Sequence, residues 1–208
     1  MRKVLLILFS IVFLAIGSGC TGQQGGATTI SANPDSNYVK TFKDLELGIL
    51  YDFKFNLENA KEKWVNVWVE RYTDGKKDSN PLVDLSYGMS PRDSLTGHLG
   101  FGIINPNSDS TMVFLYAPGV KSHPILLAQP FPKNHPRTWG YSIGDEEVEL
   151  EPEKTKVLGV YRQSSSKNSI RGYNMKDPEA IKQMIKNDKV VLLLKIKVED
   201  RRKSDETT

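Results

Sequence analysis

Cysteine is almost absent from this sequence, since Cys20 is the only one among 208 residues. The chain can form no disulfide within itself, so its fold must be held together by an apolar core alone. Histidine is also scarce: His98, His123 and His135 are separated by 25 and 12 positions. The short spacings of zinc sites, such as H-x-x-H, are therefore missing. We predict no metal site and no cofactor.

Charge of one sign is not in excess either. The formal net charge is +3, or +1 without Arg2 and Lys3, and cations and anions alternate along the chain. Domains that bind nucleic acid usually carry a basic face or stripe. Nucleic acid is therefore not an expected partner.

The apolar run at the N-terminus is too short to span a bilayer. It covers residues 4–16, about 13 residues, whereas a spanning helix needs roughly 20. Two cations precede it, and the small residues Gly17, Ser18 and Gly19 follow it. This is the layout of a secretory signal segment, so residues 1–19 are predicted to be a signal peptide.

Cys20 directly follows these small residues, which give a peptidase access to the backbone. In this feature the chain resembles bacterial lipoproteins, although Gly17 stands where leucine is commonest. The resemblance implies that Cys20 carries an acyl lipid such as palmitate and anchors the protein at the extracytoplasmic face of the cell membrane. The alternative is an ordinary signal peptide cut near Gly19, which would leave an exposed thiol without a disulfide partner.

The segments at the two ends of the remaining chain are polar. Residues 21–37 are rich in Gly, Gln, Thr and Ser and have almost no large apolar side chains. Such a segment buries too little surface to offset its chain entropy. We therefore predict a lipidated cysteine and flexible tether over 20–39, a folded domain over 40–200 and a polar tail over 201–208.

The body of the chain has a period-two pattern interrupted by turn residues. Ile49, Tyr51, Phe53, Phe55 and Leu57 alternate with more polar residues, among them Asp52. Alternation of this kind is typical of antiparallel strands with one face in the core. Strands are predicted at 48–57, 64–73, 82–87, 98–104, 112–117, 125–128, 148–150, 156–161 and 190–198.

One helix is predicted near the C-terminus. Asp177 can cap it, Pro178 suits its first position, and Ala180, Ile181, Met184 and Ile185 form an apolar stripe that ends near Asn187 or Asp188. The fold class is therefore all-β with one helix: an antiparallel β-sandwich, most simply immunoglobulin-like. Residues 68–76 and 150–158 are similar to segments of the sandwich ectodomains of Firmicute lipoproteins, which implies the same fold.

The motif Gly140-Tyr141-Ser142-Ile143-Gly144 matches the letters of the G-x-S-x-G nucleophile elbow. No helix is predicted after Ser142, and all three histidines precede it, whereas hydrolases of that class place the histidine after the serine. We therefore predict no catalytic residue. A cell-envelope hydrolase with a site assembled from Ser142 and a histidine such as His135 is the alternative.

Aromatic residues give the strongest hint of a binding surface. Trp64, Trp68 and Tyr72 fall on one face of a predicted strand at intervals of four residues. An open face would suit a sugar or a protein partner, whereas a covered face would make the rings part of the core. Trp139 ends a proline-rich loop over 129–139 that is a second candidate.

Together these patterns predict an extracytoplasmic lipoprotein. Its sandwich domain would be a non-enzymatic binding or accessory module at the membrane surface. Its expected partners are membrane lipid through Cys20 and an envelope protein or cell-wall polymer through the domain.

Overall fold

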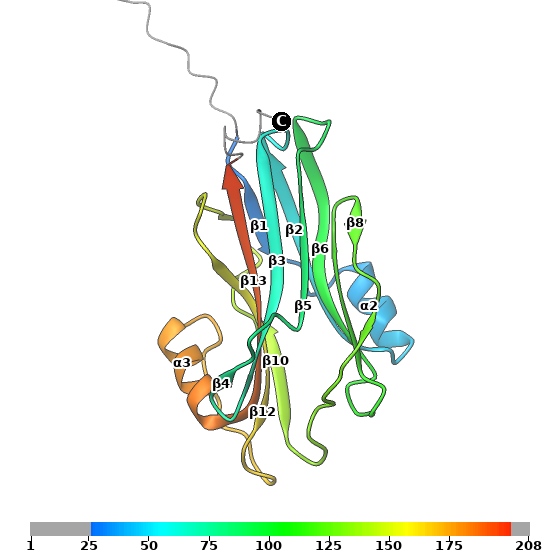
Figure 1. Ribbon diagram of the computed structural model, residues 1–208, viewed down its shortest axis with the longest axis vertical. Coiled ribbons are helices and arrows are strands. Elements are labelled where there is room, and N and C mark those ends of the chain that lie inside the picture. Colours follow the sequence, from blue (N-terminus) through cyan, green and yellow to red (C-terminus); the bar gives the residue numbers. More distant parts are fainter. Residues whose placement is uncertain (1–25, 201–208) are drawn as a thin grey trace, which may run out of the picture.

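The computed structural model describes residues 26–200, which form two antiparallel β-sheets packed face to face (Figure 1). This confirms the predicted all-β sandwich, the two-sheet architecture that immunoglobulin-like domains share. The elements are β1 Thr29–Ala32, α2 Asn37–Asp44, β2 Gly48–Glu58, β3 Lys63–Thr73, β4 Lys76–Lys77, β5 Val83–Gly88, β6 Ser94–Ile104, β7 Met112–Ala117, β8 Val120–Lys121, β9 Ile125–Leu126, β10 Arg137–Tyr141, β11 Val148–Glu149, β12 Lys156–Ser164, α3 Pro178–Asn187 and β13 Asp188–Asp200.

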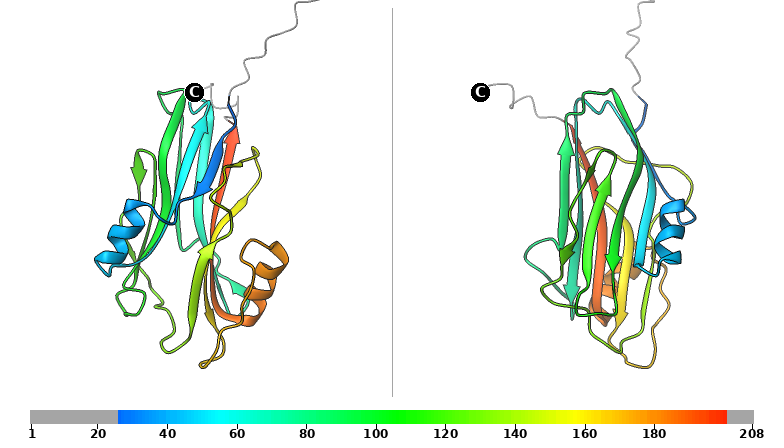
Figure 2. Two further views of the ribbon diagram at one scale, coloured as in Figure 1. Left: turned by 180° about the vertical axis from the view of Figure 1, so that it is seen from behind. Right: turned by 90° about the vertical axis from the view of Figure 1, so that its right-hand side faces the viewer.

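The two sheets have different strand orders. Sheet A runs β11-β1-β2-β6-β7-β8, with β9 also paired to β7. Sheet B runs β10-β12-β13-β3-β4, with β5 also paired to β3. The helices lie on the outer flanks, α2 beside sheet A and α3 beside sheet B (Figure 2).

The core between the sheets has the residues that alternation predicted. Tyr51, Phe53, Phe55 and Leu57 of β2 are buried. They share one apolar cluster with the valines of β3, which are Val65, Val67 and Val69. Because side chains alternate between the faces of a strand, the same pattern leaves Trp64, Trp68 and Tyr72 on the outer face of sheet B.

Helix α3 forms as predicted. The Asp177 carboxylate accepts a hydrogen bond from the backbone N–H of Glu179 at 2.9 Å, and Pro178 occupies the first turn, where its missing N–H costs nothing. The helix buries Ile181 and Met184 in a second apolar cluster with Val160, Val191 and Leu193 on the outer face of sheet B.

The predicted tether over 20–39 is wrong in its second half. Residues 29–32 form β1, which pairs with both β2 and β11, and Ile30 opposite Phe55 is fully buried. Helix α2 follows, capped by the hydroxyl of Ser36, which accepts from the N–H of Val39 at 3.2 Å. The folded domain therefore begins before residue 40. The backbone of β1 is ordered by hydrogen bonds to a strand on each side, which the polar composition of the segment did not indicate.

Asp52 lies on the face of β2 that points away from the core, as the alternation predicts, yet it is completely buried. Asn33, His98 and Tyr116 surround its carboxylate, and the Tyr38 ring of α2 packs on His98 at 4.4 Å between centroids. The unpredicted helix thus covers part of the outer face of sheet A.

Both ends of the described chain lie at one end of the sandwich. β1 starts and β13 finishes there, whereas α3 lies toward the opposite end (Figure 1). The described chain therefore begins at the end of the sandwich away from α3. Cys20 itself, with residues 1–25 and 201–208, lies outside the described residues.

Candidate functional site

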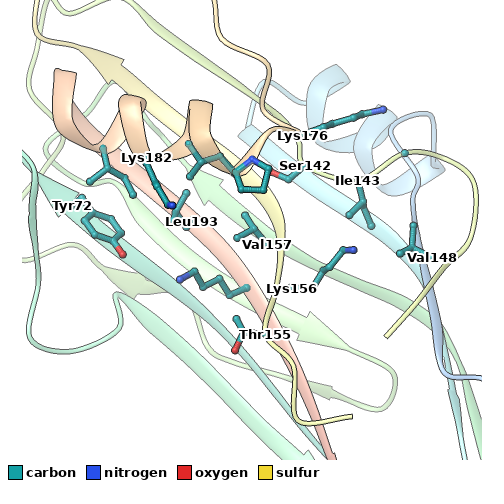
Figure 3. Close-up of a pocket in the computed structure, with 15 residues that line it drawn as sticks. Tyr72, Ser142, Ile143, Val148, Thr155, Lys156, Val157, Lys176, Lys182 and Leu193 are labelled. Atoms are coloured by element: carbon teal, nitrogen blue, oxygen red, sulfur yellow. The ribbon is translucent and has the colours of Figure 1, made fainter. Parts of the chain in front are cut away.

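A groove of about 620 Å³ runs beneath α3, and we call it the α3 groove. Its walls come from α3, from the outer face of sheet B and from the segment around residues 142–157 (Figure 3). It is open along one side rather than enclosed. The residues that line it are Tyr72, Ser142, Ile143, Gly144, Val148, Thr155, Lys156, Val157, Lys176, Pro178, Ile181, Lys182, Ile185, Leu193 and Lys195.

The floor of the α3 groove is apolar. Val157 and Leu193 come from the neighbouring strands β12 and β13, and Ile181 and Ile185 face them from the helix. These residues continue the cluster that docks α3 on the sheet. The groove exists because the helix covers only part of this apolar strip.

Lysines surround this floor. Lys195 pairs with Glu70 at 2.8 Å and Lys182 pairs with Glu179 at 2.8 Å. Lys156 and Lys176 make no ion pair within residues 26–200, and no described carboxylate lines the groove. The groove therefore combines an apolar floor with uncompensated positive charge, which suits a partner that is both apolar and anionic.

Glu70 organises the sheet surface beside the groove. Its carboxylate accepts hydrogen bonds from Lys195, Lys77, Tyr72 and Trp68 at 2.8, 2.7, 2.7 and 3.2 Å. Burial by itself raises the pKa of Glu70, but these four donors outweigh it and lower the pKa to about 2. Glu70 therefore has its hydrogen-bond donors and its counter-charges within the protein.

The predicted aromatic stripe of Trp64, Trp68 and Tyr72 lies on this outer face. It is neither a fully open platform nor part of the core. Trp64 is 37% exposed, while Trp68 and Tyr72 are half-buried. Tyr72 packs against the cluster beneath α3 and lines the groove. The stripe therefore leads into the α3 groove at its Tyr72 end.

The structure does not bring Trp139 to the stripe. It lies on the edge strand β10 and is 49% exposed. Trp139 is paired across the sheet with Tyr161, Tyr161 with Leu192, and Leu192 with Arg71. Residues paired in this way share one face of the sheet, so Trp139 lies on the face of Arg71, opposite that of Tyr72. Strand β10 was not predicted, so this register could not be read from the sequence.

The G-x-S-x-G match is not a nucleophile elbow in the structure. Gly140 and Tyr141 end strand β10, and no helix follows. The Ser142 hydroxyl is buried without a hydrogen-bond partner, while Nδ1–H of His135 donates to the Ser164 carbonyl at 2.7 Å. The described residues do not form the serine–histidine contact that the hydrolase alternative requires.

A second polar cluster surrounds Asp52. Its carboxylate accepts from His98 Nδ1–H at 2.8 Å, from the Tyr116 hydroxyl at 2.8 Å and from Asn33 Nδ2 at 2.9 Å. Burial, together with the charge of Asp52, raises the pKa of Tyr116, so its hydroxyl remains a donor. No described hydroxyl hydrogen-bonds to Nε2 of His98. The cluster therefore fixes the fold around α2 and lacks the nucleophile of a catalytic triad.

The lysines and the floor of the α3 groove were missed at the sequence level. Lys156 and Lys195 look like ordinary outward residues of strands, and Lys176 precedes the helix cap. The available signal was the apolar stripe of 180–185, which indicated that α3 covers part of a sheet. Which lysines meet around it depends on how β12, the segment before α3, α3 itself and β13 pack together.

No protein-family model, curated protein or solved structure matches the chain. In residues 26–200, no three side chains of His, Cys, Asp or Glu gather closely enough to hold a metal ion. Neither helix in that range is long and apolar enough to cross a membrane.

Proposed function

We propose that this protein is an extracytoplasmic lipoprotein, anchored to the cell membrane through Cys20, whose β-sandwich is a non-enzymatic binding module. The α3 groove is its binding site. The partner is an envelope protein, which presents a segment with apolar and acidic side chains to the groove. The observation that carries this proposal is the apolar floor flanked by Lys156 and Lys176, neither of which has an ion pair among the described residues.

The open shape of the groove favours a protein partner over a free lipid. An acyl chain is best removed from water in an enclosed cavity, whereas an open groove can be covered by a segment of another protein. The half-exposed stripe that ends at Tyr72 extends the same surface with aromatic side chains, which are enriched at interfaces.

The position of the groove fits an anchored protein. The described chain starts at one end of the sandwich, and α3 lies near the other end (Figure 1). A lipid on Cys20 would therefore hold the groove away from the bilayer. In that arrangement the groove faces partners in the envelope.

The anchor is tested separately from the groove. Globomycin, which blocks lipoprotein signal peptidase, should make the precursor accumulate, and Cys20→Ser should move the protein from the membrane fraction to the medium. If neither change occurs, the protein is not held by a lipid on Cys20.

The groove is tested by photo-crosslinking in intact cells that produce the anchored chain. A photoreactive residue at Thr155, on the groove, is compared with one at Lys121, an exposed position outside it. We expect a discrete protein adduct from position 155 only, and mass spectrometry should locate it in an acidic, part-apolar segment. Equal adducts from both positions, or an adduct with a cell-wall polymer, would contradict the proposal.

A further inference from the structure

Arg71 is a buried arginine at the end of the sandwich near α3. It precedes Tyr72 on β3, so its side chain enters the space between the sheets while Tyr72 faces the α3 groove. Only 4% of Arg71 is exposed. Its guanidinium carbon lies 5.9 Å from the centre of the Phe131 ring.

This guanidinium has one hydrogen bond and no ion pair within residues 26–200. Nη1 donates to the carbonyl oxygen of Gln129 at 2.7 Å, while Nε is buried without a partner and Nη2 makes no hydrogen bond. A buried charge without a counter-charge is costly, since its lost hydration is not replaced. Burial accordingly lowers the pKa of Arg71, an effect that the charge of Asp78 partly opposes.

A second buried arginine, Arg162, shows what is missing. Arg162 also donates Nη1 to a carbonyl oxygen, that of Arg171, at 2.7 Å. Its remaining edge holds the Asp188 carboxylate in two hydrogen bonds, from Nε at 2.6 Å and from Nη2 at 3.0 Å. In Arg71 the same Nε–Nη2 edge has no protein partner. The two side chains thus differ by one carboxylate.

Arg71 lines a cavity of about 440 Å³ between the segment 78–82 and the edge strand β9. The lip of this cavity is apolar and open to solvent, because Ile125 is 46% exposed and Leu126 is 60% exposed. Asp78, an exposed side chain, is the one carboxylate among the described lining residues, and it makes no ion pair with Arg71. The cavity is within the size range of small-ligand sites and shares no lining residue with the α3 groove.

We propose that this cavity binds a small carboxylic acid with an apolar chain, whose carboxylate pairs with Nη2 of Arg71, the guanidinium nitrogen that is neither hydrogen-bonded nor closed off from solvent, and whose chain lies against Ile125 and Leu126. The ligand carboxylate supplies to Arg71 the counter-charge that Asp188 supplies to Arg162. The site is independent of the proposed function of the α3 groove.

The test uses the full chain with Cys20→Ser and a series of straight-chain carboxylates from propanoate to octanoate, each matched by its neutral amide. Nuclear magnetic resonance follows the side-chain Nε–H signal of Arg71 and the backbone amides of Leu126 and Leu127. We expect saturable shifts at these three sites with the acids and none with the amides.

Four variants decide which groups carry the binding. Arg71→Met should weaken it by at least about tenfold, Arg71→Lys should weaken it less because a charge remains, and Lys121→Met, outside the cavity, should leave it unchanged. Asp78→Asn should strengthen it by about two- to fivefold, since a like charge is removed.

The proposal is overturned if no acid of the series shifts the Arg71 signal or if acids and amides act equally. It is also overturned if Arg71→Met, folded by its own amide spectrum, binds the acids as the parent chain does. Each of these outcomes is expected if Arg71 has only a structural role at the end of the sandwich.

Discussion

Arg162 and Arg71 are buried to nearly the same degree in one sheet, yet only Arg162 has a carboxylate. Arg162 faces the α3 side, where Asp188 and the Tyr173 ring, 4.6 Å from its guanidinium carbon, enclose it. Arg71 faces the interior near a cavity that opens beside β9. The charge of Arg162 is thus neutralised within the fold, whereas the charge of Arg71 is left available for a ligand.

The same distinction applies to the charges around α3. Glu70 has four donors within the protein, whereas Lys156 and Lys176 at the groove have no carboxylate partner among the described residues. Removing a charge that has internal partners should therefore lower stability. Removing one without them should affect binding more than folding.

The largest effect is expected from Asp188→Asn, which leaves the buried Arg162 without its counter-charge. The free energy of unfolding should fall by about 3–5 kcal/mol, as measured by chemical denaturation. Asp74→Asn is the matched control, because the ion pair of Asp74 with Lys189 is exposed and should contribute at most about 1 kcal/mol. Equal effects of the two substitutions would show that Arg162 does not depend on its partner.

Glu70→Gln should have the next largest effect, and it should depend on pH. The pKa of Glu70 is about 2 in the folded chain and 4.5 as an ordinary carboxyl, so its stabilisation is complete above that ordinary value and is lost as pH falls toward 2. The substitution should cost about 2–3 kcal/mol near pH 7 and flatten the pH dependence between those values. Denaturation curves across this range measure it, with exposed Glu147→Gln as the control. If Glu70→Gln lowers the free energy of unfolding by the same amount at every pH, the low pKa of Glu70 is contradicted.

Arg71→Met should have the smallest effect on stability. The variant loses the hydrogen bond to Gln129 but removes an unpaired buried charge, and these two changes oppose each other. The free energy of unfolding should stay within about 1 kcal/mol of the parent chain. A loss as large as that of Asp188→Asn would mean that the fold requires Arg71, and the contrast between the two arginines would fail.

The core of the fold was predictable because it depends on local alternation. The strands β2 and β3 and the cap of α3 follow from residues close together in sequence, such as Phe53 beside Phe55 and Asp177 before Pro178. Strand β1 was missed because its four residues are mostly small and polar, and its order comes from pairing with β2 and β11.

The candidate site was only partly predictable. The pattern of Trp64, Trp68 and Tyr72 indicated a special outer face, but the groove at its end needs α3, β12 and β13 together. Asp52 and Arg71 appear in the sequence as ordinary strand residues. Whether a buried charge has a partner depends on contacts such as that between Asp52 and His98, 46 residues apart, which no local pattern contains.

The most direct test of the proposed function reverses the charge of the α3 groove. Lys156→Glu with Lys176→Glu should reduce the adduct from position 155 by about tenfold or more, because an acidic partner would then meet like charge. Lys40→Glu with Lys121→Glu, at exposed positions outside the groove, should leave the adduct yield unchanged. If the groove pair leaves the adduct intact while both variants fold and reach the membrane, the α3 groove is not the binding site.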